Sequence, residues 1–331
     1  MRTRAHLAVL PFLVGCAGLT DPDAPPWRQI EGEGPSPRWG HVLVHDPAGD
    51  RLIAFGGNGP SGKLGDAWTF SLETETWEEL STGPGPLPRL TPAAILDAPR
   101  NRMIVVGGDV GLSFASDETW ALDLGTLTWS ELPRIPVPRF DVIATSDAER
   151  AWFYGGFSAQ FAELEDLWEL DLATDTWRTP PDDGVRPGAR SNGGITKIGD
   201  RLVITMGHDS VDITDDTWEY DLLHERWTEL SPAGEPFVGA HYGYATDELL
   251  ETLVLVGGDD NDHFDVGVTS ALILDGAPRF GQLRTSTLLP PRRHTAAAID
   301  PVRRNLVIFG GWEGFGNTLG DTWAHSLAGG P

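Results

Sequence analysis

Six apolar runs that end in glycine recur along this chain at intervals of about fifty residues, and five of them end in a pair of glycines. Runs that are apolar at every position suit strands buried on both faces, and paired glycines permit positive φ and close approach of backbones. A period of this length indicates repeats that bury their apolar faces against one another. In the fourth run, RLVITMGH, His208 stands in place of the second glycine. The first glycines are Gly56, Gly107, Gly155, Gly207, Gly257 and Gly310.

Tryptophans give a second repeating signal. In four repeats, two tryptophans nine residues apart follow the glycines, and we expect them to pack between neighbouring sheets. In the fifth repeat, Ala271 and Phe280 hold these positions, and the sixth has only Trp323. Trp27, near the other end of the chain, has no partner before it, so the simplest arrangement is a ring closed by the N-terminal strand. The four pairs are Trp68 and Trp77, Trp120 and Trp129, Trp168 and Trp177, and Trp218 and Trp227.

An arginine ends a proline- or glycine-containing segment before five of the six glycine runs, and Gly239 takes its place in the fifth repeat. An acidic residue recurs two positions before the first tryptophan. Together these signals resemble the kelch repeat, over about residues 27–328. The resemblance implies an all-β, six-bladed β-propeller with four antiparallel strands per blade, its ring closed by the N-terminal strand. The arginines are Arg38, Arg89, Arg139, Arg190 and Arg292, and the acids are Asp66, Glu118, Asp166, Asp216 and Asp321.

The resemblance also implies where a ligand would bind. In kelch propellers the segment before the innermost strand and the loop after the glycine pair share one face, which commonly binds the ligand. This places the five arginines near the central funnel of that face. Two interpretations stay open: each arginine pairs with a recurring acid inside the blade, or the arginines together hold a carboxylate or an acidic peptide. Further candidates on this face are Trp39, Phe140, His208, His241 and Trp312.

The loops after the glycines carry further aromatic residues, which suit sugar stacking or protein contacts, or else fill the loops. One loop also holds a polar cluster, Asp259, Asp260, Asp262 and His263. Oxygen-rich runs of this kind bind calcium in some proteins, but Phe264 stands where an EF-hand needs glycine, so we favour a solvated acidic loop and expect no cofactor. The loop aromatics are Phe114, Phe157, Phe161, Phe264, Trp312 and Phe315.

Catalytic motifs are scarce. The galactose-oxidase type of kelch enzyme needs a copper site with a Cys–Tyr crosslink, and the only cysteine here, Cys16, is assigned to lipidation below. The sequence contains neither a nucleophile elbow nor a phosphate-binding P-loop motif. His208 and His241 could transfer protons, so a sugar-acid mutarotase or isomerase is the alternative. We favour a binding module.

The N-terminus is expected to be a targeting segment rather than part of the fold. Residues 1–15 combine basic Arg2 and Arg4 with a short apolar run, as in an export signal. The segment ending at Cys16 resembles the lipobox of bacterial lipoproteins, which implies lipidation of Cys16. Residues 16–26 then form a tether, and Ala17 favours the outer membrane of a Gram-negative cell envelope.

The net charge of the chain excludes some classes of partner. The chain has 49 acidic and 24 basic residues, a formal charge of −25. Such a chain lacks the basic surface needed for non-specific nucleic-acid binding or for docking on anionic lipids by charge alone. We therefore expect an envelope protein, or a small acidic or carbohydrate ligand, as the partner of a monomeric, lipid-anchored propeller.

Overall fold

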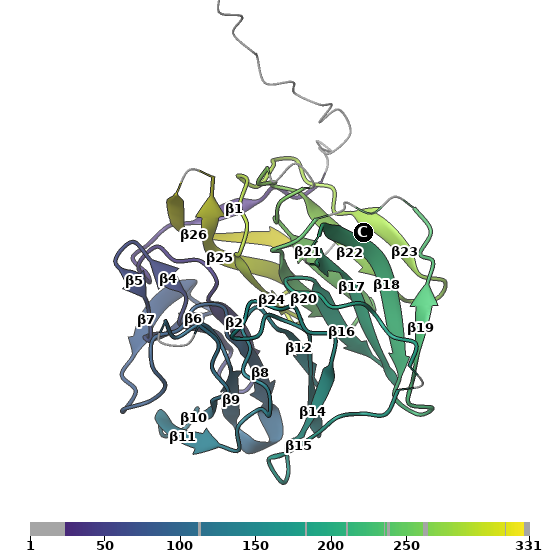
Figure 1. The fold of residues 1–331 in the computed structure, drawn as a ribbon. Helices are drawn as coiled ribbons and strands as arrows, with labels where there is room; N and C mark the ends of the chain where they lie inside the picture. Colours follow the sequence, from purple (N-terminus) through teal and green to yellow (C-terminus); the bar gives the residue numbers. More distant parts are fainter. Residues whose placement is uncertain are drawn as a thin grey trace, which may run out of the picture.

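Six four-stranded antiparallel sheets surround a central channel in the computed structural model, which describes residues 24–327 except 112–113, 183, 210, 235, 237–238, 261–263 and 315. Figure 1 looks approximately along the channel, with the innermost strand of each blade nearest the centre. This arrangement confirms the predicted six-bladed propeller. Among the described residues, no helix has the length and apolar character needed to cross a membrane.

The strands follow one another from the channel outward in the first five blades. Blade 1 contains β2 (Val42–Asp46), β3 (Arg51–Phe55), β6 (Ala67–Ser71) and β7 (Thr76–Leu80), with a small β4 (Asn58–Gly59) and β5 (Gly62–Lys63) hairpin in its loop. Blade 2 contains β8 (Ala93–Asp97), the 3-10 turn η1 (Ala98–Arg100), β9 (Arg102–Val106), β10 (Thr119–Asp123) and β11 (Thr128–Leu132). Blade 3 contains β12 (Ile143–Ser146), β13 (Arg150–Tyr154), β14 (Leu167–Asp171) and β15 (Thr176–Arg178). Blade 4 contains β16 (Gly194–Ile198), β17 (Arg201–His208), β18 (Ile213–Asp221) and β19 (Arg226–Leu230). Blade 5 contains β20 (Gly243–Asp247), β21 (Thr252–Val256), β22 (Thr269–Ile273) and β23 (Arg279–Gln282).

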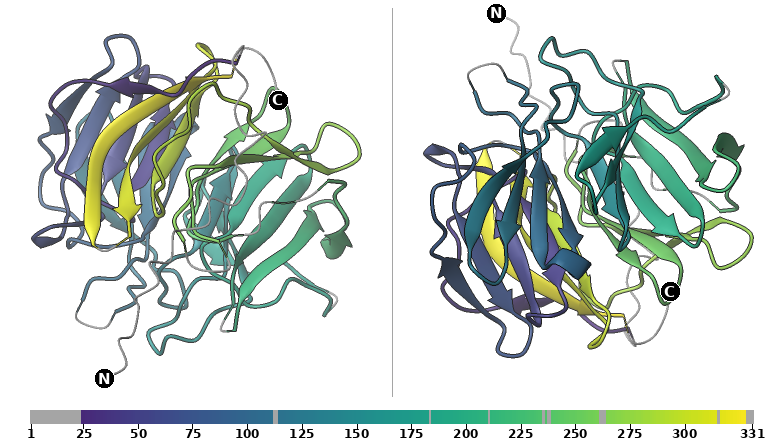
Figure 2. Two further views of the ribbon diagram at one scale, coloured as in Figure 1. Left: turned by 90° about the horizontal axis from the view of Figure 1, so that it is seen from above. Right: turned by 90° about the horizontal axis from the view of Figure 1, so that it is seen from below.

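Blade 6 closes the ring. Its first three strands are β24 (Ala296–Asp300), β25 (Asn305–Glu313) and β26 (Asn317–Ser326), and its outermost strand is the N-terminal β1 (Arg28–Ile30). Gln29 lies opposite Trp323 in the β1–β26 pairing, and Figure 2 shows the purple start of the fold beside this yellow strand. The closure predicted from the unpaired Trp27 is therefore confirmed.

The blades pack face to face through their second strands, which explains why those strands are apolar on both sides. Ile53 and Phe55 of blade 1 pack in one cluster with Met103 and Val105 of blade 2. The second tryptophan of a repeat fills the space between blades, and the ring of Trp129 lies 5.1 Å from that of Phe55. The second tryptophans of the repeats are thus part of the core between blades, as expected.

The glycine pairs mark close approaches between successive repeats. Gly155 has a φ of +64°, and a Cβ added there would lie 2.1 Å from the carbonyl oxygen of Arg190. In blade 4 the assignment made from the sequence is wrong by one residue. Met206, with a φ of +56°, holds the first position, and Gly207 holds the second. The carbonyl of Met206 accepts a hydrogen bond from Arg190, as the carbonyl of Gly155 does from Arg139.

Candidate binding site at the axial mouth

A closed ring of six backbone hydrogen bonds surrounds the axis at one end of the channel. Its members lie at one position in each repeat, directly before the innermost strand, and all have positive φ. Each N–H donates to the carbonyl oxygen of the ring residue in the preceding blade, at donor–acceptor distances between 2.7 and 3.4 Å. We call these residues the axial crown: Gly40, Thr91, Asp141, Asn192, His241 and His294.

The crown places polar side chains on a conformation that few of them favour. Left-handed backbone is usual for glycine, asparagine and aspartate, whereas β-branched Thr91 at a φ of +45° is a strained exception. His241 and His294 share the same conformation. Strain of this kind persists only where the surrounding structure enforces it, and it concentrates at functional sites. The crown therefore marks this mouth of the channel as a candidate site.

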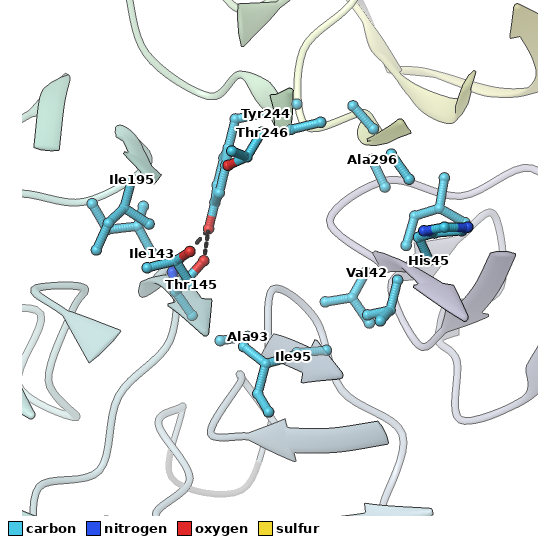
Figure 3. Close-up of a pocket in the computed structure, with 18 of the residues that line it drawn as sticks. Val42, His45, Ala93, Ile95, Ile143, Thr145, Ile195, Tyr244, Thr246 and Ala296 are labelled. Carbon is cyan, nitrogen blue, oxygen red and sulfur yellow. Dashed lines mark hydrogen bonds between the residues drawn. The ribbon is translucent and has the colours of Figure 1, made fainter. Parts of the chain in front are cut away.

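Below the crown, the six innermost strands enclose a cavity of about 600 Å³. Its walls are largely apolar, and Figure 3 shows Val42, Ile95, Ile143 and Ile195 among the side chains around it. The hydroxyl of Tyr244 reaches Ala144 two blades away, accepting from its N–H at 2.8 Å and donating to its carbonyl at 3.1 Å. All crown residues except His241 line this cavity.

Several buried polar atoms at this end have no hydrogen-bond partner among the described residues: Asp141 Oδ1, Thr91 Oγ1 and both ring nitrogens of His41. Burial raises the pKa of Asp141 to about 6. Burial also lowers the pKa of His41 to about 3, so this ring is neutral. Unmade hydrogen bonds in buried groups are costly, and so these atoms are suited to meeting a ligand.

Two histidines are oriented by buried carboxylates on the rim of the crown. His241 Nδ1 lies 2.7 Å from Asp259 Oδ1, and Asp259 also accepts a hydrogen bond from Arg293 at 2.7 Å. Although burial opposes ionisation, these two contacts hold the pKa of Asp259 below its usual value. His208 Nδ1 lies 3.2 Å from Glu163 Oε1, and burial raises the pKa of Glu163.

The crown histidines lie side by side. The rings of His241 and His294 are 4.4 Å apart, whereas His208 is 6.5 Å from His241. Burial, and then the nearby His241, hold the pKa of His294 well below its ordinary value, so this ring is neutral at neutral pH.

Aromatic rings surround the polar centre. Trp39 stacks on Trp312 with ring centroids 6.1 Å apart, and the guanidinium of Arg293 lies 4.2 Å from the Trp312 ring centroid. On the opposite side, Phe140 stacks on Phe157 at 5.3 Å. Trp39, Phe140, His208 and Trp312, all candidates from the sequence, therefore meet around the crown, together with His241.

The five repeat arginines lie behind this surface, at most 1% exposed. Each pairs with the recurring acid of its own repeat, and Arg139 shows the pattern. It donates to both carboxylate oxygens of Asp166 at 2.8 Å, to the Gly155 carbonyl at 2.9 Å and to the Val137 carbonyl at 3.1 Å. Of the two interpretations left open, this geometry matches pairing within the blade, because a ligand could reach the arginines only by displacing their acids. The other pairs are Arg38–Asp66, Arg89–Glu118, Arg190–Asp216 and Arg292–Asp321.

The polar loop after β21 is described only in part, because Asp262 and His263 lie outside the described residues. Both oxygens of Asp259 are taken by His241 and Arg293, and one oxygen of Asp260 accepts from the backbone N–H of Phe264. Within the described ranges, no group of three histidine, cysteine or acidic side chains is placed to hold a metal ion. The expectation of a solvated loop without a cofactor therefore stays a prediction, and Cys16 likewise lies outside the described chain.

Sequence reasoning missed Thr91, Asp141, Asn192, His294, Arg293 and Glu163. A signal was available for the crown, because its members lie two positions after the repeat arginine, or after Gly239 in the fifth repeat. Aligned on that position, five of the six repeats carry a polar residue. Residue type varies along this column, so a motif search does not reveal it.

We expect the stability of the protein to depend on the ionisation of Asp141. Its pKa of about 6 in the fold exceeds the value of about 3.9 for an unfolded chain. The stability contributed by the protonated carboxyl is therefore present below the unfolded pKa and is lost as pH rises through about 6. Two neighbouring side chains act on the same group: His241 favours the ionised form, and Asp109 opposes it.

The variant Asp141→Asn stays neutral at every pH, so it should gain stability relative to wild type as pH rises from about 4 to about 7. Urea denaturation of both proteins at the two pH values measures the change. If wild type and variant differed in unfolding free energy by the same amount at both pH values, the pKa of Asp141 would be the same in the folded and unfolded protein.

Comparison with known proteins gives a consistent result. The KLHDC2/KLHL20/DRC7 Kelch-repeats domain matches residues 20–139 and 133–311. Acyl-CoA-binding domain-containing protein 4 of Arabidopsis thaliana is 28% identical over 261 residues, covering 75% of this chain and 38% of that protein. Rab9 effector protein with kelch motifs of Xenopus laevis is 27% identical over 214 residues, 59% of this chain and 57% of its own. Kelch domain-containing protein 10 of Xenopus tropicalis is 30% identical over 218 residues, 62% and 53% respectively. The chain thus spans less than two thirds of each relative.

Proposed function

Because this chain belongs to the kelch-repeat family, whose propellers generally mediate protein interactions, we propose that it is a binding module that docks a protein partner on its crown face. The crown face is the end of the propeller that carries the axial crown and the loops after the glycine pairs. A binding module needs a surface that the isolated protein leaves exposed, and the crown face has one in the loops of blades 2 and 3.

Two exposed phenylalanines carry this proposal. Phe114 and Phe161 are 47% and 56% exposed, and their rings meet at 4.9 Å although they come from different blades. Their φ angles are +61° and +57°, a conformation that is unfavourable for bulky side chains. Phe161 also contacts Phe140, which links the pair to the rim of the crown. Exposed aromatic clusters of this kind are typical anchors of protein interfaces.

The prediction of a small acidic ligand depended on free arginines. Because the five guanidiniums are paired with acids, that prediction loses its support. A carbohydrate ligand, and proton transfer by His208 and His241, stay predictions that no observation favours over protein binding. We propose a monomer, because the closed ring of blades supplies its own packing.

We further propose that the module is exported and anchored by a lipid on Cys16, in the outer membrane of a cell envelope. The relatives named above are eukaryotic, so this part rests on residues 1–26 alone: the basic start, the short apolar run and the sole cysteine. Metabolic labelling with palmitate in a bacterial host tests it. Incorporation into wild type but not into Cys16→Ser is expected, and equal incorporation into both would contradict the anchor.

The function is tested by capture of partners from the protein's own envelope, quantified by mass spectrometry. A partner recovered with wild type should be reduced at least tenfold with Phe114→Ala/Phe161→Ala. The control is Leu249→Ala/Val302→Ala, which removes two exposed apolar side chains, 71% and 83% accessible, from turns at the other end of the blades. Recovery that survives the phenylalanine variant, or that both variants reduce equally, would refute docking on the crown face.

A further inference from the structure

We propose that the axial crown receives a cationic side chain, a lysine ammonium or an arginine guanidinium, presented by the protein that docks on the crown face. The inference deepens the proposed function and rests on it for the source of the cation. It follows from unmet hydrogen-bond acceptors, from the local balance of charge and from the aromatic surroundings.

The unmet acceptors include two carboxylate oxygens. Asp141 Oδ1 and Glu163 Oε2 are buried and lack a hydrogen-bond partner among the described residues, and the Glu163 side chain is only 2% exposed. A polar path joins them: Asn192 donates to Ser191 at 3.3 Å, and Ser191 donates to Glu163 at 3.3 Å, while the Asn192 N–H contacts the Asp141 carbonyl. A ligand that satisfies these oxygens must bring donors, and donors on a cationic nitrogen make the strongest bonds.

Charge around the crown also favours a cation. Five acids lie there against one lysine and one arginine, besides the histidines, and both of these cations are occupied: Lys63 pairs with Asp109 at 2.8 Å, and Arg293 pairs with Asp259 at 2.7 Å and with Asp265 at 3.2 Å. Within the described chain, Asp141 has no arginine or lysine partner. The neutral His294 adds no positive charge. The five acids are Asp109, Asp141, Glu163, Asp259 and Asp265.

The net negative charge of the whole chain also favours a cationic ligand. A chain of net charge −25 attracts basic surfaces and speeds their encounter. Near the mouth, the stacked Trp39 and Trp312 and the stacked Phe140 and Phe157 offer ring faces, which attract cations. The Trp312 ring already holds the guanidinium of Arg293 at 4.2 Å, so this environment accepts such a group.

The probes for the test are two terminally blocked tripeptides, Gly-Arg-Gly and Gly-Lys-Gly, with Gly-citrulline-Gly as a neutral isostere of the arginine peptide. Titration into the protein is followed by NMR of the histidine ring protons and by calorimetry. At least one cationic peptide should bind at least tenfold more tightly than the citrulline peptide. Equal binding of all three would overturn the proposal.

Variants locate the contact. Asp141→Asn keeps the shape of the side chain and should weaken the cationic peptide at least tenfold. Asp117→Asn is the matched control, because it removes one charge from a loop of the same face, where Asp117 already pairs with Arg134. It should change binding less than twofold. Glu163→Gln provides a second test that does not depend on the folding of the Asp141 variant. Unchanged binding by both Asp141→Asn and Glu163→Gln would refute the crown as the site.

The two proposals fail separately. Phe114→Ala/Phe161→Ala should lose the protein partner while keeping the cationic peptide, since the phenylalanines lie outside the crown. If the phenylalanine variant loses the partner but wild type binds no cationic peptide, docking on the crown face stands and the cation proposal is refuted. Peptide binding in a protein that captures no partner leaves the crown site intact and refutes docking.

Discussion

Replacing Trp27 with alanine should lower the free energy of unfolding by about 4 kcal/mol. Trp27 is 4% exposed and belongs to the core between blades 5 and 6, where its ring lies 5.3 Å from that of His325. It also anchors β1, whose three residues alone pair the N-terminal segment with β26. The variant therefore loses both a large buried side chain and much of what holds the ring closed. Urea denaturation measures the loss.

Trp227→Ala is the matched control, because Trp227 is also 4% exposed but lies in blade 4, whose four strands are consecutive in the chain. Both variants should lose similar packing energy. Only Trp27→Ala should speed hydrogen exchange at the amides of β1. A loss below about 1 kcal/mol, with β1 still protected, would mean that backbone pairing alone closes the ring.

Replacing Arg139 with leucine should cost about 3 kcal/mol, because it leaves Asp166 without its cation and two carbonyl oxygens without a donor. The Arg139 side chain is fully buried, whereas Asp166 stays 32% exposed, which places the cost at the low end of the range for buried pairs. Arg134→Leu is the control. It breaks pairs with Asp117 and Glu131, but Arg134 is 52% exposed, so the loss should be far smaller than that of Arg139→Leu.

The dependence on pH identifies the mechanism. Burial opposes the ionisation of Asp166, but the hydrogen bonds and charge of Arg139 outweigh it and lower the pKa. The stability from this pair is therefore present above the unfolded pKa of about 3.9 and is lost as pH falls through the lower folded value. The gap between wild type and Arg139→Leu should shrink below about pH 4. Full stability of the variant at neutral pH would return Arg139 to the set of ligand-binding candidates.

The fold could be predicted because each blade repeats the same physical requirements. Close approach of backbones demands glycine, and the space between blades demands a large apolar ring, so these residues recur at fixed spacing. The misplaced pair in blade 4 shows the limit of such reasoning. Methionine rarely adopts the left-handed conformation that Met206 has here, and Gly207, directly after it, takes the place of the missing glycine in the sequence pattern.

The site could be predicted only in part. Trp39, Phe140, His208, His241 and Trp312 do meet at the axial mouth, because their positions in the repeat place them there. The arginines were ambiguous because burial depends on an acid 26 to 29 residues away along the chain, whose position only the folded blade determines. The crown was missed because its members share a backbone conformation rather than a residue type.

The closed backbone ring of the axial crown bears on how such a protein can change in evolution. A linear array of repeats can lengthen or shorten by one unit, because its end units simply move. Here every blade donates to one neighbour and accepts from the other, so the sixth bond returns to the first blade. Gaining or losing one repeat would break this circuit and require all the blades to re-form it at a different angle. We therefore expect sequence variation to concentrate in the loops and in the side chains on the crown, which the backbone circuit does not constrain.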